Sequence, residues 1–188
     1  MLYTTLASPV GELLLVGAAT DQAPGGLALA SLSMPGQRGA AVPAPHWRRT
    51  PELFAAAAEE IEEYFAGERH AFTLTLRTGG TGFQERVWRA LEAIPYGATI
   101  SYGQLAARVG VGRGEVRAVG AAVGANPLLL VRPCHRVIGA DGTLRGFAAG
   151  LDRKEFLLRH EGALAPTLDL AGEATAASAP AGPAVGFG

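Results

Sequence analysis

The sequence has a single cysteine, Cys134, among its 188 residues. One thiol cannot form an internal disulfide, and the first residues lack the basic start and unbroken apolar run of a secretory signal. We therefore expect a reducing, cytoplasmic environment. Long hydrophobic runs are also missing, because glycine, proline and charged residues interrupt the apolar stretches well short of the roughly 20 residues that cross a membrane. No association with membranes is expected.

A large excess of charge of either sign is absent as well. The formal net charge is -1 and the isoelectric point is about 6.4. Proteins that coat nucleic acid without selectivity carry a strong positive excess, so that role is excluded. The balance becomes more basic from Arg113 onward, and any DNA-binding site must be local to that part of the chain.

The first part of the chain predicts a small sheet and one helix. Short runs of β-forming residues, separated by glycine and proline, predict strands at 2–6, 12–16, 27–32 and 72–76. Thr50 is expected to cap a helix that begins with Pro51 and ends at Gly67, in which apolar residues recur every four positions. Residues 34–46 lack periodicity and predict a loop. A glycine-rich turn then ends a first subdomain, which we place at residues 1–78.

The second part, which we place at residues 79–162, predicts helices with clear start signals. Two capping boxes are present, Thr81 with Gln84 and Ser101 with Gln104. The second box opens a short helix, and a turn containing three glycines separates it from a helix at 115–124. Two short helices joined in this way give the outline of a helix-turn-helix, which by itself is a weak signal of DNA binding.

The last helix is expected at 151–160, and the residue after it is unusual. Glu161 lies three residues beyond Leu158 and four beyond Leu157, so it shares their apolar face. A carboxylate on such a face needs a partner. Residues 163–188 are mostly alanine, glycine and proline and predict a disordered tail.

The chemistry of the chain centres on the one thiol. Cys134 precedes His135 and has Arg132 and Arg136 close by in the sequence. A lone cysteine is most often a small buried hydrophobic residue. Imidazole and guanidinium groups beside a thiol favour the thiolate, which is the nucleophilic form, so this sequence predicts a reactive cysteine.

Several short motifs surround this cysteine in a fixed order. They are Thr81-Gly82-Phe83-Gln84 with Val87-Trp88, Ile94-Pro95-Tyr96-Gly97, Ser101-Tyr102, Arg117-Ala118-Val119-Gly120, Asn126-Pro127, Pro133-Cys134-His135-Arg136-Val137 and Lys154 to Glu161. In order and spacing they resemble the O6-alkylguanine-DNA alkyltransferases, with weaker similarity before Thr81. The resemblance implies an α+β fold. A ribonuclease-H-like N-terminal subdomain, made of a small antiparallel sheet and a helix, would pack on a mostly helical domain that carries the helix-turn-helix.

The resemblance also implies a reaction and the residues that perform it. The sulfur of Cys134 would displace guanine from an alkyl group on O6, in a single turnover. His135 would act as the base, through a bridging water, and Glu161 would hold its ring in the correct tautomer. Asn126 would organise the cysteine loop. Tyr102 would donate a proton or hydrogen bond to the guanine.

A further set of residues would bind double-stranded DNA that contains the alkylated guanine. Arg117 matches the side chain that fills the base stack when the damaged base is flipped out. Small residues follow it on the same helix and suit close approach to the minor groove: Ala118, Gly120, Ala121, Gly124 and Ala125. The pocket for the flipped base would comprise Tyr102, Val137, Phe147 and Ala148. Phe147 stands where many relatives have tyrosine, which removes a hydroxyl.

We therefore expect single-turnover repair of O6-alkylguanine, with O4-methylthymine as a possible second substrate, by a monomer. No cofactor is expected, and no metal either, because the other histidines are scattered at His46, His70 and His160. Two alternatives stay open. One is a non-catalytic module that binds alkylation damage in DNA, which Cys134 argues against. The other is a Cys-His hydrolase or thiol oxidoreductase, which Arg117 and the alanine-rich helix argue against.

Overall fold

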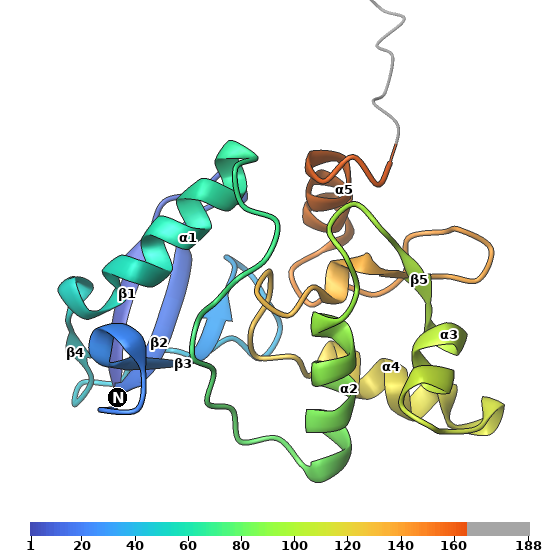
Figure 1. Cartoon of the computed structure of the whole chain (residues 1–188), viewed down its shortest axis with the longest axis horizontal. Coiled ribbons are helices and arrows are strands. Elements are labelled where there is room, and N and C mark those ends of the chain that lie inside the picture. Colours follow the sequence, from blue (N-terminus) through green and yellow to red (C-terminus); the bar gives the residue numbers. More distant parts are fainter. Residues whose placement is uncertain (165–188) are drawn as a thin grey trace, which may run out of the picture.

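The computed structural model describes residues 1–164, and the tail expected at 163–188 lies almost wholly outside them. The chain forms an α+β structure in two parts that lie side by side (Figure 1). One part holds a small sheet and one helix, and the other is mostly helical. Among the described residues, no helix is both long and apolar enough to cross a membrane.

The sheet of the first part has four strands in the order β3-β2-β1-β4. They are β1 (Leu2–Leu6), β2 (Leu13–Ala19), β3 (Leu27–Ser33) and β4 (Arg48–Arg49). The first three are antiparallel neighbours, as the short loops between them predict, and the two-residue β4 pairs parallel to β1. The sequence did not predict β4. A 3-10 turn, Pro24–Gly26, precedes β3.

The helix of this part is α1 (Ala55–Ala66), and it ends at Gly67 in the left-handed conformation, as predicted. Its start was predicted wrongly. Residues Pro51–Phe54 form a separate 3-10 turn, and the hydroxyl of Thr50 makes no capping hydrogen bond. The backbone N–H of Thr50 instead donates to the carbonyl of Tyr3, so Thr50 prolongs the pairing of β4 with β1.

The strand predicted at 72–76 is found only at its last residues. This segment is extended, but only Leu76 makes a bridge, with Leu29 of β3. The backbone N–H of Thr73 donates to Oε2 of Glu60 on α1 instead of to a neighbouring strand. At the end of the segment, the backbone N–H of Leu29 donates to the carbonyl of Thr75 at 2.8 Å, and the N–H of Arg77 donates to the carbonyl of Leu29 at 2.9 Å. The alternation therefore predicted a whole strand where only the last residues join the sheet.

The second part contains four helices and two very short strands. Their bounds are α2 (Gly82–Glu92), β5 (Ile100–Ser101), α3 (Tyr102–Arg108), α4 (Val116–Gly124), β6 (Val137–Ile138) and α5 (Leu151–His160). Both capping boxes are confirmed. The turn between α3 and α4 ends in a 3-10 segment, Arg113–Glu115, and a second such segment, Cys134–Arg136, precedes β6. The strands β5 and β6 pair in parallel.

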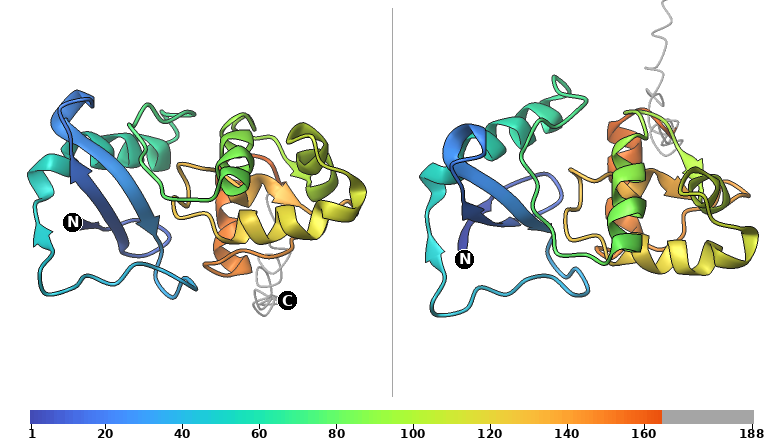
Figure 2. Two further views of the ribbon diagram at one scale, coloured as in Figure 1. Left: turned by 90° about the horizontal axis from the view of Figure 1, so that it is seen from below. Right: turned by 60° about the horizontal axis from the view of Figure 1, so that its bottom comes forward.

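The two parts are joined through the chain that leads to the cysteine. The backbone N–H of Leu32, in β3, donates to the carbonyl of Pro127 at 2.9 Å, and the N–H of Leu129 donates to the carbonyl of Leu32 at 3.1 Å. Leu130 then adopts a φ of 73°, which is rare for a branched side chain. Figure 2 shows this segment passing between the sheet and the helices. The first part therefore helps to fix the path of the cysteine loop.

Candidate active site

The thiol lines a small cavity that is formed mainly by the second part of the molecule. Cys134 begins the 3-10 segment and is 3% exposed. Its backbone N–H donates to the carbonyl of Arg132 at 2.7 Å, which closes the loop tightly. The cavity has a volume of about 220 Å³ and is lined by Arg38, Tyr102, Gly120, Val123, Gly124, Cys134, Gly146, Phe147 and Ala148. The structure thus brings the thiol together with five of the residues named above.

The electrostatic environment of the thiol differs from the one that the sequence predicts. Burial raises the pKa of Cys134 to about 11, although a hydrogen bond from the side chain of Asn126 and the charge of Lys154 oppose this rise. Neither neighbouring guanidinium supports a thiolate. Arg132 pairs with Glu92, and Arg136 pairs with Glu161. The expectation that these arginines favour a thiolate is therefore wrong, and the resting thiol needs a base.

The imidazole of His135, the residue after Cys134, is in contact with the carboxylate of Glu161. Nε2 of His135 is 2.7 Å from Oε1 of Glu161, and both side chains are fully buried. Burial alone would raise the pKa of Glu161, but hydrogen bonds from His135 and Arg136 hold it well below its usual range. Burial lowers the pKa of His135, against the pull of Glu161. The structure therefore favours a neutral imidazole beside an ionised carboxylate.

The second nitrogen of this imidazole has no protein partner. Nδ1 of His135 is buried and makes no hydrogen bond within the described residues. A buried ring nitrogen without a partner is uncommon in native structures. Because Nε2 is engaged with Glu161, Nδ1 is the atom left to accept a proton.

Asn126 holds the cysteine loop through its side-chain amide. Its Nδ2 donates to the carbonyl of Arg132 at 2.8 Å, and its Oδ1 accepts from the backbone N–H of Leu128 at 3.1 Å. The carbonyl of Arg132 therefore accepts from both Asn126 and Cys134. This arrangement connects the end of α4 to the thiol.

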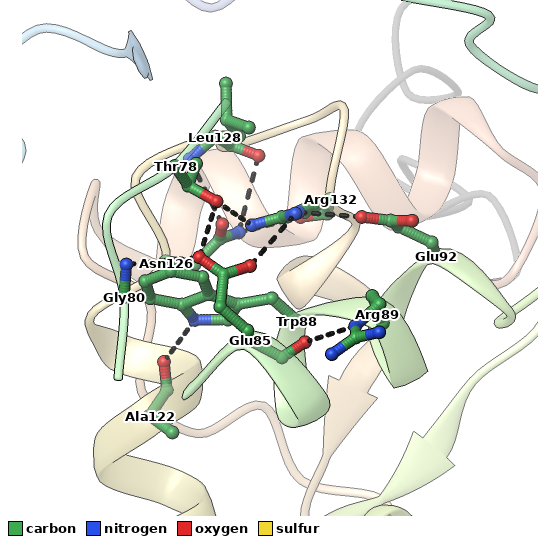
Figure 3. A network of polar contacts seen from close by, with 10 residues as sticks. All are labelled: Thr78, Gly80, Glu85, Trp88, Arg89, Glu92, Ala122, Asn126, Leu128 and Arg132. Carbon is green, nitrogen blue, oxygen red and sulfur yellow. Dashed lines mark hydrogen bonds and ion pairs between the residues drawn. The ribbon is translucent and has the colours of Figure 1, made fainter. Parts of the chain in front are cut away.

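The side chain of Arg132 anchors the same loop to α2 (Figure 3). Its Nε donates to Glu92 at 2.7 Å, and a second nitrogen lies 3.5 Å from Glu85. A third donates to the hydroxyl of Thr78 at 2.9 Å, and the guanidinium lies over the ring of Trp88. Arg132 thus ties the cysteine loop to α2 and to the segment that joins the two parts.

Two residues at the site received no role from the sequence. Lys154 is fully buried, and its Nζ donates to the carbonyls of Val137 and Arg145, both at 2.6 Å. Burial lowers the pKa of Lys154 to about 8. Its position three residues before Leu157, on the same apolar face as Glu161, was a usable signal. Arg38 lines the cavity from the first part, and no pattern in its loop indicated this.

The expected DNA-binding residues lie together on α4 and at its C-terminal end. Arg117, Ala118, Ala121, Gly124 and Ala125 are exposed, while the other face of the helix is buried. Gly120 and Gly124 line the cavity, so this exposed face meets the mouth of the thiol site.

The remaining expected pocket residues differ in position. The hydroxyl of Tyr102, at the start of α3, donates to the carbonyl of Arg145 at 3.2 Å. Phe147 and Ala148 line the cavity, whereas Val137 is fully buried in β6 and does not. Within residues 1–164, no group of three or more histidine, cysteine or acidic residues is arranged to hold a metal ion.

These observations define a class of protein: an α+β structure with a helix-turn-helix and a cysteine–histidine–glutamate site. A helix pair joined by a glycine-containing turn presents a face of small residues, and a buried cysteine, histidine and glutamate lie beside it in an α+β structure. Two family models match the chain: the ribonuclease-like domain of 6-O-methylguanine DNA methyltransferase at residues 1–78, and its DNA binding domain at residues 82–163. The chain belongs to the 6-O-methylguanine DNA methyltransferase family.

Individual relatives agree with this assignment. The methylated-DNA--protein-cysteine methyltransferase of Methanosarcina acetivorans is 45% identical over 162 residues, which cover 86% of this chain and 99% of the relative. The protein of the same name from Mycolicibacterium paratuberculosis is 46% identical over 160 residues, covering 85% and 91%. The crystal structure of Mycobacterium tuberculosis OGT in complex with DNA matches with a TM-score of 0.77 and 42% identity, over 89% of this chain and 96% of that one.

Proposed function

We propose that this protein repairs DNA by moving an alkyl group from O6 of guanine to Sγ of Cys134. One observation carries the proposal: the thiol faces a cavity that opens beside the exposed face of α4, with His135 and Glu161 directly behind it. The names of the relatives support the same activity. In the reaction an S–C bond forms, the C–O6 bond breaks, and the thiol proton must leave the sulfur.

The buried imidazole supplies the route for that proton. Nδ1 of His135 accepts it through a bridging water, because a buried thiol with a raised pKa does not ionise unaided at neutral pH. Glu161 stabilises the imidazolium that results. The departing guanine needs a proton or a hydrogen bond in turn. Tyr102 at the cavity wall is our candidate donor, and its hydroxyl would exchange the carbonyl of Arg145 for the guanine.

The exposed face of α4 is our candidate for the DNA contact. Its small side chains allow the helix backbone to approach the minor groove, and Arg117 replaces the flipped base in the stack. Ala148, which lines the cavity, would bind the flipped base through its backbone N–H. The N–H of Val137 already donates to the carbonyl of Cys134, so we propose no such role for it. Action by a monomer in the cytoplasm, a division of the chain near residue 78 and activity on O4-methylthymine are parts of the same proposal.

The decisive experiment incubates the protein with duplex DNA that contains one O6-methylguanine. We expect one methyl group per protein molecule, on Cys134, with no further turnover, because no second thiol is present to remove it. Intact mass and peptide mapping measure both. Cys134→Ser is the control and should bind the DNA without accepting the methyl. Repeated turnover, or transfer to another residue, would refute the proposal. Binding of the damaged DNA without transfer would support a damage-sensing module instead.

Replacement of Arg117 by alanine should separate base flipping from chemistry. We expect Arg117→Ala to slow repair in duplex DNA by at least 10-fold and to leave the reaction with free O6-benzylguanine nearly unchanged, since the free base needs no flipping. Both rates are measured by Cys134 modification. Arg113→Ala is the matched control, because Arg113 is exposed just before α4. Equal losses of rate on the two substrates would show that Arg117 has another role.

A further inference from the structure

A tyrosine from the first part of the molecule reaches the carboxylate of the site. Tyr64 lies on α1 and has no exposed surface. Its hydroxyl donates to Oε1 of Glu161 at 2.7 Å, across a sequence separation of 97 residues. The motifs around the cysteine gave no indication of this contact.

The oxygen that Tyr64 contacts is the one that holds the imidazole. Oε1 of Glu161 lies 2.7 Å from Nε2 of His135 and also accepts from Arg136 at 3.0 Å. Its Oε2 accepts from Nε of Arg136 at 2.8 Å and from the backbone N–H of Gly97 at 3.3 Å. The imidazole therefore shares its acceptor atom with two other donors.

The phenol is held in place as a donor. Burial and the charge of Glu161 raise the pKa of Tyr64 far above its usual range, so the hydroxyl keeps its proton. The ring packs against Phe65, Phe72 and Tyr96. Its backbone carbonyl accepts from Nε2 of His160 at 2.8 Å. These contacts leave the phenol little freedom to turn away.

We propose that Tyr64 is a positioning residue that sets the basicity of His135 by competing with it for Oε1 of Glu161. This inference rests on the proposed function of the site. A carboxylate oxygen that already accepts from a phenol and a guanidinium gives less stabilisation to an imidazolium. Burial lowers the pKa of His135, and the weakened support from Glu161 leaves that effect of burial less opposed. His135 therefore stays neutral at neutral pH, which a group must do if it is to accept a proton.

The charges of the other groups that face the imidazole leave Glu161 as the residue that stabilises an imidazolium. Arg136 and Lys154 carry positive charge and disfavour an imidazolium. The Cys134 thiol is neutral at rest, and the phenol of Tyr96 donates to the carbonyl of His160. Glu161 is thus the one anion in direct contact with His135 among the described residues.

The test is the pH dependence of the reaction of Cys134 with free O6-benzylguanine, which needs no DNA binding. Tyr64→Phe removes one hydroxyl and keeps the packing of the ring. We expect the acidic limb of the rate profile to move to higher pH by about 0.5 to 1 unit, because the imidazolium gains a stronger partner. Tyr96→Phe is the matched control and should leave the limb in place.

A second variant tests the opposite direction. Incorporation of 3-fluorotyrosine at position 64 makes the phenol a stronger donor, so the acidic limb should move to lower pH. If Tyr64→Phe does not fold, the fluorotyrosine variant alone tests whether Tyr64 sets the basicity of His135. A lower rate without any shift of the limb, in either variant, would reduce Tyr64 to a packing residue and overturn the inference. If the unaltered protein transfers no alkyl group to Cys134, the proposed function fails instead.

Discussion

Replacement of Glu161 by glutamine is expected to cost both reactivity and stability. Arg136 is 5% exposed, and both of its contacts with a carboxylate are to Glu161. Removal of the anion leaves a buried guanidinium without a counter-charge, which typically costs about 3 to 5 kcal/mol. Alkyl transfer near neutral pH should also fall by about 100-fold or more, because the imidazolium loses its stabilising partner.

The stability loss should depend on pH in a defined direction. The pKa of Glu161 is held below its usual range in the folded protein. Its contribution is therefore fully present above the unfolded-state pKa of about 4.3 and is lost as the pH falls through the folded value. The difference between the unaltered protein and Glu161→Gln should be largest near neutral pH and shrink in acid.

Denaturant unfolding at a series of pH values measures this difference. Glu155→Gln is the matched control, because Glu155 forms an ion pair on the surface of the same helix and is 45% exposed. Exposed pairs contribute about 0 to 1 kcal/mol, so the control should unfold almost as the parent does. A loss for Glu161→Gln that is no greater than that of the control would contradict the ion-pair argument.

Removal of the two carboxylates around Arg132 is expected to destabilise the protein more than replacement of Arg132 itself. The guanidinium is 6% exposed, whereas Glu85 is 23% and Glu92 is 38% exposed. Water can solvate the carboxylates if the arginine is absent, but it cannot reach an arginine whose partners are gone. The double variant Glu85→Gln with Glu92→Gln should therefore lose about 3 to 5 kcal/mol, and Arg132→Met distinctly less.

The free energies of unfolding of both variants, and of each single carboxylate variant, test this order. Trp88 lies under the guanidinium, so its fluorescence follows the local transition once Trp47, the other tryptophan, is replaced by phenylalanine in every protein compared. The network in Figure 3 predicts that both carboxylates must be removed before the full loss appears. A larger loss for Arg132→Met than for the double variant would show that packing of the arginine stem outweighs its charge.

Local sequence signals predicted secondary structure well where residues within one element determine its conformation. Thr81 and Ser101 are helix caps by chemistry alone, and both are found as such. The signals failed where a distant element competes. Thr50 follows the edge of the sheet instead of capping a helix, and Thr73 is bound by α1 instead of by a strand. A single sequence carries no record of these competing partners.

In the candidate site, too, features set by local sequence were predicted and features set by distant elements were not. Helical spacing alone placed Glu161 on the buried face, and the structure adds the distance to His135. The protonation of the thiol could not be predicted, because neighbours in sequence need not face it. Arg132 and Arg136 point to carboxylates on other elements. The role of Tyr64 could not be predicted either, since its partner Glu161 lies 97 residues further along the sequence.

The contact between Tyr64 and Glu161 also bears on how the molecule folds. Contacts between residues this far apart in sequence slow folding, because a long loop must close before they form. The pairing of Leu32 with the segment around Pro127 has the same property. During synthesis, the sheet and α1 emerge first and can form early. The acid-base group at the thiol is completed last, so a newly made chain acquires native-like structure before it acquires a working site.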